Sequence, residues 1–465
     1  MSKYMAKKIK LFLMLVACSI FINGCSIQKT IQSNQASPVM LGIEKDMKVP
    51  GYWISVHPYP DVKLLDREDI DEINSNIEEV LQSTINIKDH SEIFPLGEVI
   101  PQINNLYKSF TNKKYYTTDG TRVDSDYFKN IEENMNLGSI GPGVELKFGI
   151  IVHYADQRLI PTKDALSRKK RKANFDRVQN NSLDIGTPVV IKHVSKDGKW
   201  YYAEGPSSAG WIAEENIVIC SREETRKFLK QNPFIVVTSP KAQIFLDENF
   251  INYYDYVRMG VKLPLIRREN VKDKLKIEIP SRANNGKLEF KEVYMSSKEV
   301  NDGYLPYTPR NVINQAFKMM NAPYAWGGIH GEQDCSQFIQ QVFATFGVNM
   351  PRNSLSQSSV GKFVGGEWSQ NTSPEKKVEI LDRYAIGGIT TLYLDGHIML
   401  FVGMVDGVPY VIHEMWGYGD KIGNEEIVRI AGRVIVSSLS IGEGSKKGSL
   451  IERVKAIRVI GKQFN

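Results

Sequence analysis

Apolar residues recur at helical spacing between residues 45 and 142. One helix is predicted after Asp66, which we expect to cap it, with Asp69 at the position of a capping-box acid. Another is predicted after Asp124, and Gly138 is expected to end it. The apolar positions that define the two helices are Ile70, Ile73, Ile77 and Leu81 in the first, and Tyr127, Phe128, Ile131 and Met135 in the second. This segment contains no candidate chemistry, and its acids are expected to form a solvated face.

Short apolar runs separated by turn sequences follow, from Val144 to about Tyr294. The turn signals include Lys196-Asp197-Gly198-Lys199 and Gly205-Pro206-Ser207. Strands at such close spacing predict small β-barrels, and we expect two of them, at 143–220 and 221–300. The strands expected in the first barrel are 147–154, 187–193, 200–203 and 211–219.

Helices and strands are mixed in the last part of the chain, 301–465. Thr308 is a predicted helix cap with Pro309 at the first helical position, and that helix should run to about Met320. A glycine-rich turn, a second helix from Cys335 to Phe346 and several strands follow. The predicted fold class is therefore multidomain, with an α+β domain preceded by two small β-barrels and an N-terminal helical segment.

The first 24 residues have the pattern of a secretory signal peptide. Lys7, Lys8 and Lys10 precede an apolar run that begins at Leu11, and this run is too short for a comfortable membrane span. The sequence Ile22-Asn23-Gly24-Cys25 resembles a bacterial lipobox, in which Cys25 becomes the lipidated first residue. An ordinary signal peptide or a plain anchor, with Cys25 incidental, is the alternative. A polar tether at 25–44 would suit an anchored protein.

Composition and charge exclude little beyond a nucleic-acid partner. The 465 residues are 42% hydrophobic and 24% charged, which is ordinary for a globular protein. The formal net charge is +6, but without the four lysines of the signal segment 55 basic residues face 53 acidic ones. This near-neutral balance does not favour nucleic-acid binding.

Two cysteines remain once Cys18 leaves with the signal peptide and Cys25 is acylated. Exported proteins usually pair their thiols. However, Cys220 ends the apolar run Ile217–Ile219 and suggests a buried strand residue, whereas Cys335 lies in a different setting. We therefore expect no disulfide between them.

Cys335 is the strongest candidate for a catalytic residue. It precedes the helical stripe Phe338, Ile339, Val342, Phe343 and Phe346, so it lies in the first turn of a predicted helix. Free N–H groups and the helix dipole should stabilise a thiolate there and lower its pKa. Gly327, Gly328 and Gly331 are expected to let the backbone approach a substrate. A buried cysteine at the start of a core helix is the competing interpretation.

Two histidines could supply the base and the orienting group that a nucleophilic thiol needs. His397 begins the strand that continues through Ile398–Val402, and His413 lies in the next strand. A two-residue Asp406-Gly407 turn would put the histidines on opposite faces. A three-residue loop with Gly407 left-handed would instead pair Met399 with His413 and place both histidines on one face. We expect the three-residue loop.

The histidines allow two other interpretations. A pair of histidines on one face is also half of a zinc site, but no further ligand pair is nearby in the sequence, so no metal is expected. His330, five residues before Cys335, is the rival base. It lies in a glycine-rich turn without an evident partner, and we expect it to be a loop residue.

The residues around Cys335 resemble the NlpC-type branch of the papain-like cysteine peptidases. The matching motifs are Asp334-Cys335-Ser336, Gly396-His397, His413, Tyr324-Ala325-Trp326-Gly327-Gly328 and Pro351-Arg352-Asn353-Ser354. The resemblance implies a catalytic set of Cys335, His397 and His413, with Tyr324 helping to build the oxyanion and substrate pocket. It further implies that Trp326, Asp334, Ser336 and Ser354 contact the peptide, and it implies no cofactor.

The upstream part resembles multidomain members of that branch that carry two bacterial SH3-like domains. The motifs are Pro161-Thr162, Phe175-Asp176, Gly186-Thr187-Pro188-Val189, Ser195 to Trp200 and Gly210-Trp211-Ile212. In such members the first SH3-like domain admits only stem peptides with a free N-terminal L-Ala. Asp156 is a guess for the residue that recognises this amine, and a solvated turn acid is the simpler interpretation. The basic run Arg168–Lys172 departs from the pattern and is expected to be an exposed loop.

The sequence thus predicts an exported, lipid-anchored peptidase of the cell envelope. Its expected substrate is the γ-D-glutamyl–diamino acid bond of peptidoglycan stem peptides, with Cys335 attacking and His397 as the base. A wall-binding lipoprotein without activity, and an amidase or acyl transferase on the same scaffold, remain open. The choice between lysine and diaminopimelate remains open as well.

Overall fold

The computed structural model describes residues 43–87, 93–140, 143–170, 175–268, 273–364 and 372–461. The predicted signal peptide, the lipidation site Cys25 and most of the tether lie outside these ranges. Within them, none of the helices has the length and apolar character needed to cross a bilayer.

The N-terminal helices pack on different parts of the chain that follows. In α2, Trp53 is fully buried and its ring lies 5.3 Å from that of Tyr410. Helix α3 has the predicted capping box between Asp66 and Asp69, because both partners of the box lie within one turn. The bounds of the helices in this part are α2 Pro50–Val56, α3 Arg67–Ser75, α4 Leu96–Thr111 and α5 Ser125–Met135.

Helices α4 and α5 share a core with the strands that come next in the chain. Val99 and Ile103 of α4 and Phe128 of α5 are buried together with Tyr202 and Trp211. Asp124 caps α5 as predicted, but the helix ends at Asn136 rather than at Gly138. Asn136 has the left-handed conformation (φ 52°), which asparagine tolerates better than most residues, so it can end the helix without a glycine.

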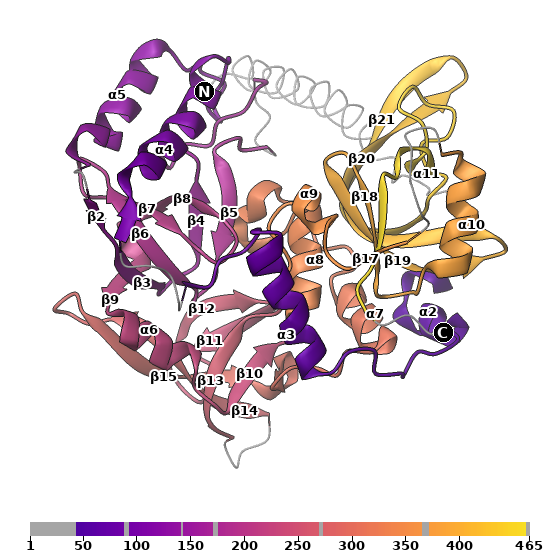
Figure 1. Ribbon diagram of the computed structural model, residues 1–465, viewed down its shortest axis with the longest axis horizontal. Helices are drawn as coiled ribbons and strands as arrows, with labels where there is room; N and C mark the ends of the chain where they lie inside the picture. Colours follow the sequence, from indigo (N-terminus) through magenta and orange to yellow (C-terminus); the bar gives the residue numbers. More distant parts are fainter. Residues whose placement is uncertain are drawn as a thin grey trace, which may run out of the picture. The chain divides into compact units, whose positions relative to one another are not determined.

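The first β-domain is an antiparallel sheet of seven strands in the order β5-β4-β8-β7-β6-β3-β9 (Figure 1). The predicted strand 211–219 is wrong as a single element, because a 3-10 turn at Glu214–Asn216 divides it. The strands are β3 Lys147–Ile151, β4 Ala155–Arg158, β5 Gln179–Leu183, β6 Pro188–Val194, β7 Trp200–Glu204, β8 Ala209–Ala213 and β9 Ile217–Cys220. A two-stranded ribbon of β1 Ile93–Pro95 and β2 Gly143–Glu145 precedes it.

The second β-domain is another antiparallel sheet of seven strands, in the order β12-β11-β15-β14-β13-β10-β16. It follows α6 (Arg222–Leu229), which Ser221 begins with a capping box. The strands are β10 Phe234–Val237, β11 Lys241–Phe245, β12 Tyr253–Arg258, β13 Lys262–Arg268, β14 Lys274–Arg282, β15 Leu288–Ser296 and β16 Val300–Asp302.

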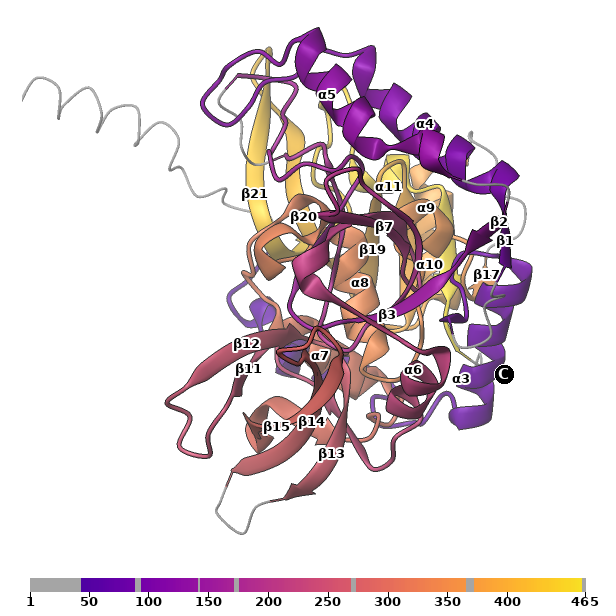
Figure 2. The same cartoon turned by 90° about the vertical axis from the view of Figure 1, so that its left-hand side faces the viewer.

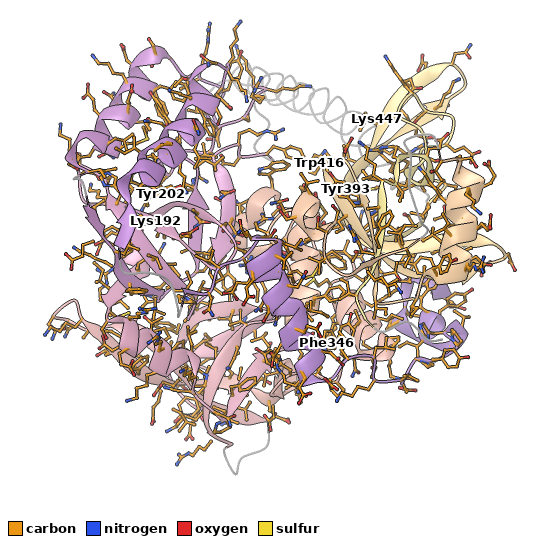
Figure 3. All side chains as sticks on the ribbon, in the orientation of Figure 1. Lys192, Tyr202, Phe346, Tyr393, Trp416 and Lys447 are labelled. Atoms are coloured by element: carbon orange, nitrogen blue, oxygen red, sulfur yellow. The ribbon has the colours of Figure 1, made fainter. Side chains whose placement is uncertain are left out.

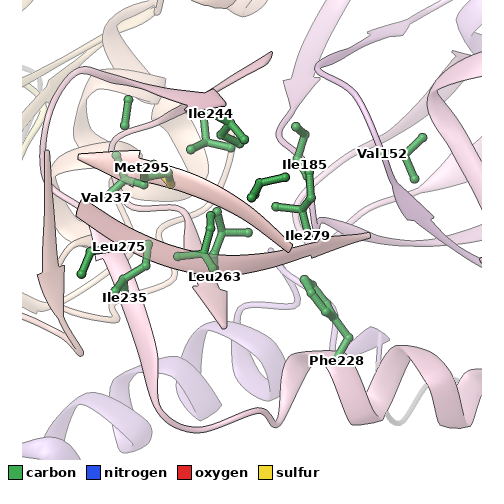
Figure 4. Packing of buried hydrophobic residues seen from close by; sticks show 14 of the residues in the cluster. Val152, Ile185, Phe228, Ile235, Val237, Ile244, Leu263, Leu275, Ile279 and Met295 are labelled. Atoms are coloured by element: carbon green, nitrogen blue, oxygen red, sulfur yellow. The ribbon is translucent and has the colours of Figure 1, made fainter. Parts of the chain in front are cut away.

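The two β-domains share one apolar core. Val152 and Ile185 of the first domain are buried with Leu263 and Ile279 of the second, and Phe228 of α6 closes the same cluster (Figure 4). Buried apolar area of this kind is the main term that holds such units together. The two β-domains are therefore packed as one support for the residues that follow.

The C-terminal domain combines a six-stranded sheet, in the order β17-β22-β18-β19-β20-β21, with helices. Helix α8 packs against β19 and β20 (Figure 2). Helix α7 begins at Pro309 with Thr308 as its cap, as predicted. The helices are α7 Pro309–Lys318, α8 Cys335–Ala344, α9 Ser354–Gln357, α10 Pro374–Tyr384 and α11 Leu450–Arg453. The strands are β17 Lys362–Phe363, β18 Thr390–Leu394, β19 His397–Val405, β20 Val408–Ile422, β21 Glu425–Ser438 and β22 Ala456–Val459.

Candidate active site

Cys335 is the first residue of α8, as the sequence predicts. The carboxylate of Asp334 caps this helix and accepts a hydrogen bond from the Gln337 N–H at 3.0 Å. The apolar stripe of α8, which includes Phe338, Val342 and Phe343, is fully buried. Packing of this stripe fixes the helix, and so it fixes the thiol at the end of the helix.

The surroundings of Cys335 raise the pKa of its thiol to about 12 instead of lowering it. Burial is the largest cause, and the negative charge of Asp334 is the second. The N–H groups of Ile398 and Ser336 and the charge of Arg352 favour the thiolate but offset only part of this. The expectation of a lowered pKa is therefore wrong, and the resting thiol is neutral.

The hairpin of β19 and β20 places His397 and His413 together. Nε2 of His397 lies 2.8 Å from Nδ1 of His413, and the ring centroids are 5.0 Å apart. Helix α8, which begins at Cys335, packs against β19, which begins at His397. The structure therefore brings the end of the cysteine helix and the two histidines to one place.

The predicted three-residue loop between these strands is wrong, although the face it implies is right. Val405 pairs with Val408, so Asp406-Gly407 is a two-residue turn, and both residues have positive φ. The extra residue lies instead in a β-bulge between Phe401 and Gly403. Leu400 consequently faces Ile412, and continuing this register by one residue sets Met399 opposite His413.

Ser437 of β21 extends the histidine pair to a chain of three side chains. His413 is fully buried, and its Nε2 lies 3.1 Å from Ser437 Oγ. With its proton on Nε2, His413 donates to Ser437 and accepts from His397 at Nδ1. His397 then carries its own proton on Nε2, and its Nδ1 is the nitrogen with a free lone pair. The sequence analysis missed Ser437, because only the pairing of β20 with β21 brings it to His413.

Both histidines are held in the neutral form. Burial is the largest cause that lowers the pKa of His397 to about 4, and the charge of Arg453 adds to it. Burial and the neighbouring His397 lower the pKa of His413 well below its ordinary value. A neutral imidazole is the form that can accept a proton from a thiol.

Replacing Ser437 with alanine is expected to lower kcat about five- to tenfold, the effect of about 1 kcal/mol for one lost hydrogen bond. Without the acceptor on Ser437, the preferred tautomer of His413 is lost, and with it the orientation of His397. Ser437→Thr keeps the hydroxyl and should restore most of kcat. Steady-state kinetics on a stem-peptide substrate would test this, and an unchanged kcat in Ser437→Ala would show that the serine does not orient the pair.

Arg352 joins the catalytic helix to the first β-domain. Its guanidinium donates to both oxygens of Asp334, at 2.7 and 3.2 Å, and to Ser336 Oγ at 2.9 Å. It also donates to Asn181 Oδ1 at 2.8 Å, on β5. The resemblance gave a role to Ser354 of this motif but none to the arginine. Asp334 and Ser336 line the site, but both accept hydrogen bonds from Arg352, and Ser336 also donates to Asp334.

The glycines before Cys335 allow the backbone of their turn to approach the two β-domains closely. A Cβ on Gly328 would lie 2.2 Å from Ser182 Oγ, and one on Gly327 would lie 2.6 Å from Gln179 Cγ. A Cβ on Gly331 would lie 2.2 Å from the Tyr256 hydroxyl. These contacts belong to the two β-domains, and Gly327 also lines the cavity at Cys335, so the approach to a substrate stays a prediction. All three have positive φ, so a side chain there is disfavoured twice.

Tyr324, Trp326, Phe175 and Trp416 form an aromatic cluster at the site. The ring of Phe175, from the first β-domain, lies 4.6 Å from Trp416 and 6.1 Å from Tyr324. Trp416 lies at a bulge of β20 between Met415 and Gly417 (Figure 3). Burial raises the pKa of Tyr324 far above its ordinary value, so its phenol is a permanent hydrogen-bond donor.

Glu414, next to His413, is a buried acid that is neutral at pH 7. Burial raises the pKa of its carboxyl to about 9, although Gln333 Nε2 donates to Oε2 at 3.0 Å. Tyr324 and Gln333 form an isolated parallel β-bridge. Because Gln333 also donates to Glu414, this acid supports the turn that carries Tyr324.

Glu414→Gln is expected to become relatively more stable as the pH rises. Folded wild type binds one more proton than the unfolded chain between pH 4.5 and about 9, so its free energy of unfolding falls with rising pH in this window. The neutral glutamine has no such dependence. Urea unfolding at pH 5 and pH 8.5 would measure the difference between the two proteins, and an equal difference at both values would show that Glu414 is not protonated.

Cys335 lines a cavity of about 700 Å³, and Gly396 brings the residue before His397 to its wall, although neither histidine is itself among the lining residues. The lining residues of this cavity come from the N-terminal helical part, the first β-domain and the C-terminal domain. They are Ser109, Phe110, Lys113 and Tyr115 in or after α4, Leu159, Arg168, Arg177, Gln179 and Asn180 of the first β-domain, and Tyr324, Trp326, Gly327, Asp334, Cys335, Ser336, Arg352, Asn353, Ser354 and Gly396 of the C-terminal domain. His330 is exposed and is not among them. Asp156 does not line the cavity either. Its carboxylate accepts hydrogen bonds from Tyr154 and Gln179.

Two family models match the regions that build this cavity. The NlpC/P60 family model matches residues 321–380, which include Cys335. The chain contains an NlpC/P60 domain. An SH3 domain model of the SH3b1 type matches residues 164–213, within the first β-domain. The resemblance stated from the sequence is thereby confirmed for the NlpC/P60 domain and for one SH3-like domain, and the second SH3-like domain stays a prediction.

One solved structure shares the fold of this chain, and one curated protein is similar to part of its sequence. An NlpC/P60 endopeptidase from Photobacterium damselae subsp. piscicida has a TM-score of 0.73 at 21% identity, covering 88% of this chain and 96% of that one, which shows a shared fold. A gamma-D-glutamyl-L-lysine dipeptidyl-peptidase of Bacillus cereus (strain ATCC 10987 / NRS 248) is 26% identical over 223 residues. That match covers 44% of this chain and 61% of the relative, less than two thirds of its length.

The described residues contain no group of three or more His, Cys, Asp or Glu side chains arranged to hold a metal ion. Cys220 and Cys335 are free thiols on β9 and α8.

Proposed function

We propose that this protein is a lipid-anchored peptidoglycan hydrolase that cleaves the γ-D-glutamyl–diamino acid bond of stem peptides. The observation that carries the proposal is Cys335 at the start of α8, beside a strand whose His397 is hydrogen-bonded to His413. A thiol, a base and an orienting group are what acyl transfer by a cysteine nucleophile requires. The activity named for the Bacillus cereus relative supports the choice of bond.

Proton transfer from Cys335 to His397 accompanies the attack on the γ-glutamyl carbonyl. The resting pair is neutral, because burial raises the pKa of the thiol and lowers that of the imidazole. Nδ1 of His397 accepts the thiol proton, while its Nε2–H continues to donate to His413. The sulfur forms a bond to the carbonyl carbon as the imidazolium forms.

The negative charge that develops on the carbonyl oxygen needs donors near the start of α8. The N–H of Cys335 lies in the first turn of this helix, where N–H groups have no partner within the helix. The neutral phenol of Tyr324 is a second donor at the same cavity. His397 then protonates the leaving amine, and water hydrolyses the thioester with His397 as its base.

The expected substrate has a free N-terminal L-alanine. The support for this is the resemblance to multidomain members of the family, in combination with the cavity wall that the first β-domain provides through Gln179 and Asn180.

Cleavage of L-Ala-γ-D-Glu-meso-diaminopimelate, with products identified by mass spectrometry, tests the proposed function. The expected products are the dipeptide L-Ala-γ-D-Glu and free diaminopimelate. Binding of wall fragments without cleavage would instead support a wall-binding lipoprotein. Transfer of the dipeptide to an added amine in preference to water would support an acyl transferase, and release of the intact peptide from a muramoyl-peptide would support an amidase.

The anchor and the location in the cell envelope rest on the sequence of the first 25 residues. Mass spectrometry of the N-terminal peptide from the native protein should find acylated Cys25 as its first residue. A mature protein that begins at another residue, or that retains residues 1–24, would contradict the lipid anchor.

A further inference from the structure

The charged side chains that line the site cavity are strongly unequal in sign. Four are basic, Lys113, Arg168, Arg177 and Arg352, and one is acidic, Asp334. Arg352 and Asp334 form an ion pair at 2.7 Å, so their charges offset each other. Three positive charges then remain at the cavity, and no ion pair is described for any of the three among the described residues.

Two of these three cations are held by aromatic rings rather than by acids. The guanidinium of Arg177 lies 4.7 Å from the centre of the Trp326 ring and 5.4 Å from that of Phe175. The guanidinium of Arg168 lies 5.4 Å from the centre of the Tyr115 ring. Stacking on a ring orients a guanidinium but leaves its N–H groups available, and two of them match the two oxygens of a carboxylate.

The three cations come from two segments of the chain that meet at the cavity. Lys113 follows α4, whereas Arg168 and Arg177 belong to the segment of the first β-domain between β4 and β5. Trp326, beneath Arg177, belongs to the turn before Cys335. A ligand at Cys335 therefore meets positive charge contributed by two parts of the chain that precede the peptidase domain.

We propose that Lys113, Arg168 and Arg177 form a carboxylate-binding rim that selects stem peptides with free rather than amidated carboxyl groups. A γ-linked glutamyl residue leaves its α-carboxylate next to the bond that is cleaved, and a diaminopimelate residue brings a further carboxylate. Each is a planar anion that a stacked arginine binds with two hydrogen bonds. Amidation removes the charge and replaces one acceptor by a donor, which faces the N–H groups of the rim.

The rim is chemically distinct from the catalytic set, although the inference rests on the proposed function. Lys113, Arg168 and Arg177 hold no proton that the reaction moves, and loss of their charge leaves the thiol and both histidines unchanged. The rim is thus expected to act on kcat/KM for charged substrates and to leave amidated substrates nearly unaffected.

Four peptides test the proposal: L-Ala-γ-D-Glu-diaminopimelate, the same peptide with the glutamyl α-carboxyl amidated, the same peptide with the distal carboxyl of diaminopimelate amidated, and L-Ala-γ-D-Glu-L-Lys, which lacks that distal carboxyl. We expect the wild-type full chain to favour the unmodified peptide over at least one amidated form by about tenfold in kcat/KM. The amidated peptide with the lower kcat/KM identifies the carboxylate that the rim binds.

In the variants Arg177→Gln and Arg168→Gln and in the double variant, the ratio of kcat/KM for the unmodified peptide to kcat/KM for that amidated peptide should fall towards one. Cleavage of the amidated peptide is the internal measure that the variants fold. Arg177→Lys, which keeps the charge, should retain part of the preference, and Lys169→Gln is a matched control, since Lys169 is exposed next to Arg168 but does not line the cavity.

Equal cleavage of free and amidated peptides by the wild type would overturn the inference and leave the proposed function in place. A preference that persists in the double variant would also overturn it. Failure to cleave any of the four peptides would overturn both.

Discussion

Cys335→Ala is expected to lower kcat/KM for the stem peptide by at least about 10⁴-fold, because no other group at the cavity can form the thioester. The substitution removes one sulfur atom from a site where α8 is already fixed by its apolar stripe. The protein should therefore remain folded and still bind the peptide. Product release measured by mass spectrometry, together with a thermal unfolding curve, would separate a chemical loss from a loss of fold.

Cys220→Ala is the matched control for this variant. Cys220 is the other free thiol among the described residues, and burial raises the pKa of its thiol to about 11. It lies on β9 and accepts or donates a hydrogen bond with Thr225 at 3.2 Å, so its loss should leave kcat/KM unchanged. Full activity in Cys335→Ala, or a comparable loss in Cys220→Ala, would refute the role of Cys335.

Replacing His397 with glutamine is expected to lower kcat by about 10⁴-fold, as removal of one member of a nucleophile–base set does in other hydrolases. The pKa of the Cys335 thiol is about 12, so very little thiolate exists at pH 7 without a base. Glutamine can still hydrogen-bond to His413 but cannot accept the thiol proton at neutral pH. Dipeptide release measured in quenched reactions would show the loss of kcat.

His330→Asn tests the rival base. His330 has a left-handed conformation (φ 61°), which asparagine tolerates, so this variant keeps the turn. We expect its kcat to equal that of wild type. The pH profile adds a second readout: the pKa of His397 is lowered to about 4, so the neutral base should persist below pH 6. A larger loss in His330→Asn than in His397→Gln would assign the base to His330.

Elements that depend on interactions within one turn were predictable from the sequence. The caps at Asp66, Asp124 and Thr308 form as expected, because each cap bonds to a residue three positions later. Cys335 likewise begins α8 because Asp334, the residue before it, is the cap. The sequence pattern was sufficient wherever the cause lies within a few residues.

The hairpin of β19 and β20 shows where such local reasoning fails. The Asp406-Gly407 pair indicates a two-residue turn, and that is what forms. The face shared by the histidines instead depends on the bulge at Val402, which no turn sequence announces. The histidines do share one face of the hairpin as predicted, but the β-bulge causes this and not the turn.

The remaining errors arise from tertiary contacts. The N-terminus of α8 does favour a thiolate, but the depth at which Cys335 is buried and the charge of Asp334 outweigh it. Arg352 and Ser437 belong to the site only because β5 and β21 pack beside it. None of these causes has a signature in the spacing of residues along one chain.

Covalent labelling of the nucleophile tests the central claim most directly. A chloromethyl ketone built on L-Ala-γ-D-Glu places its reactive carbon next to the position of the γ-carbonyl, and attack by a thiol forms a C–S bond and releases chloride. Peptide mapping by mass spectrometry should find the label on Cys335, with loss of activity in proportion to labelling and protection by the stem peptide. A label on Cys220 or on a histidine, or full activity after complete labelling of Cys335, would contradict the account.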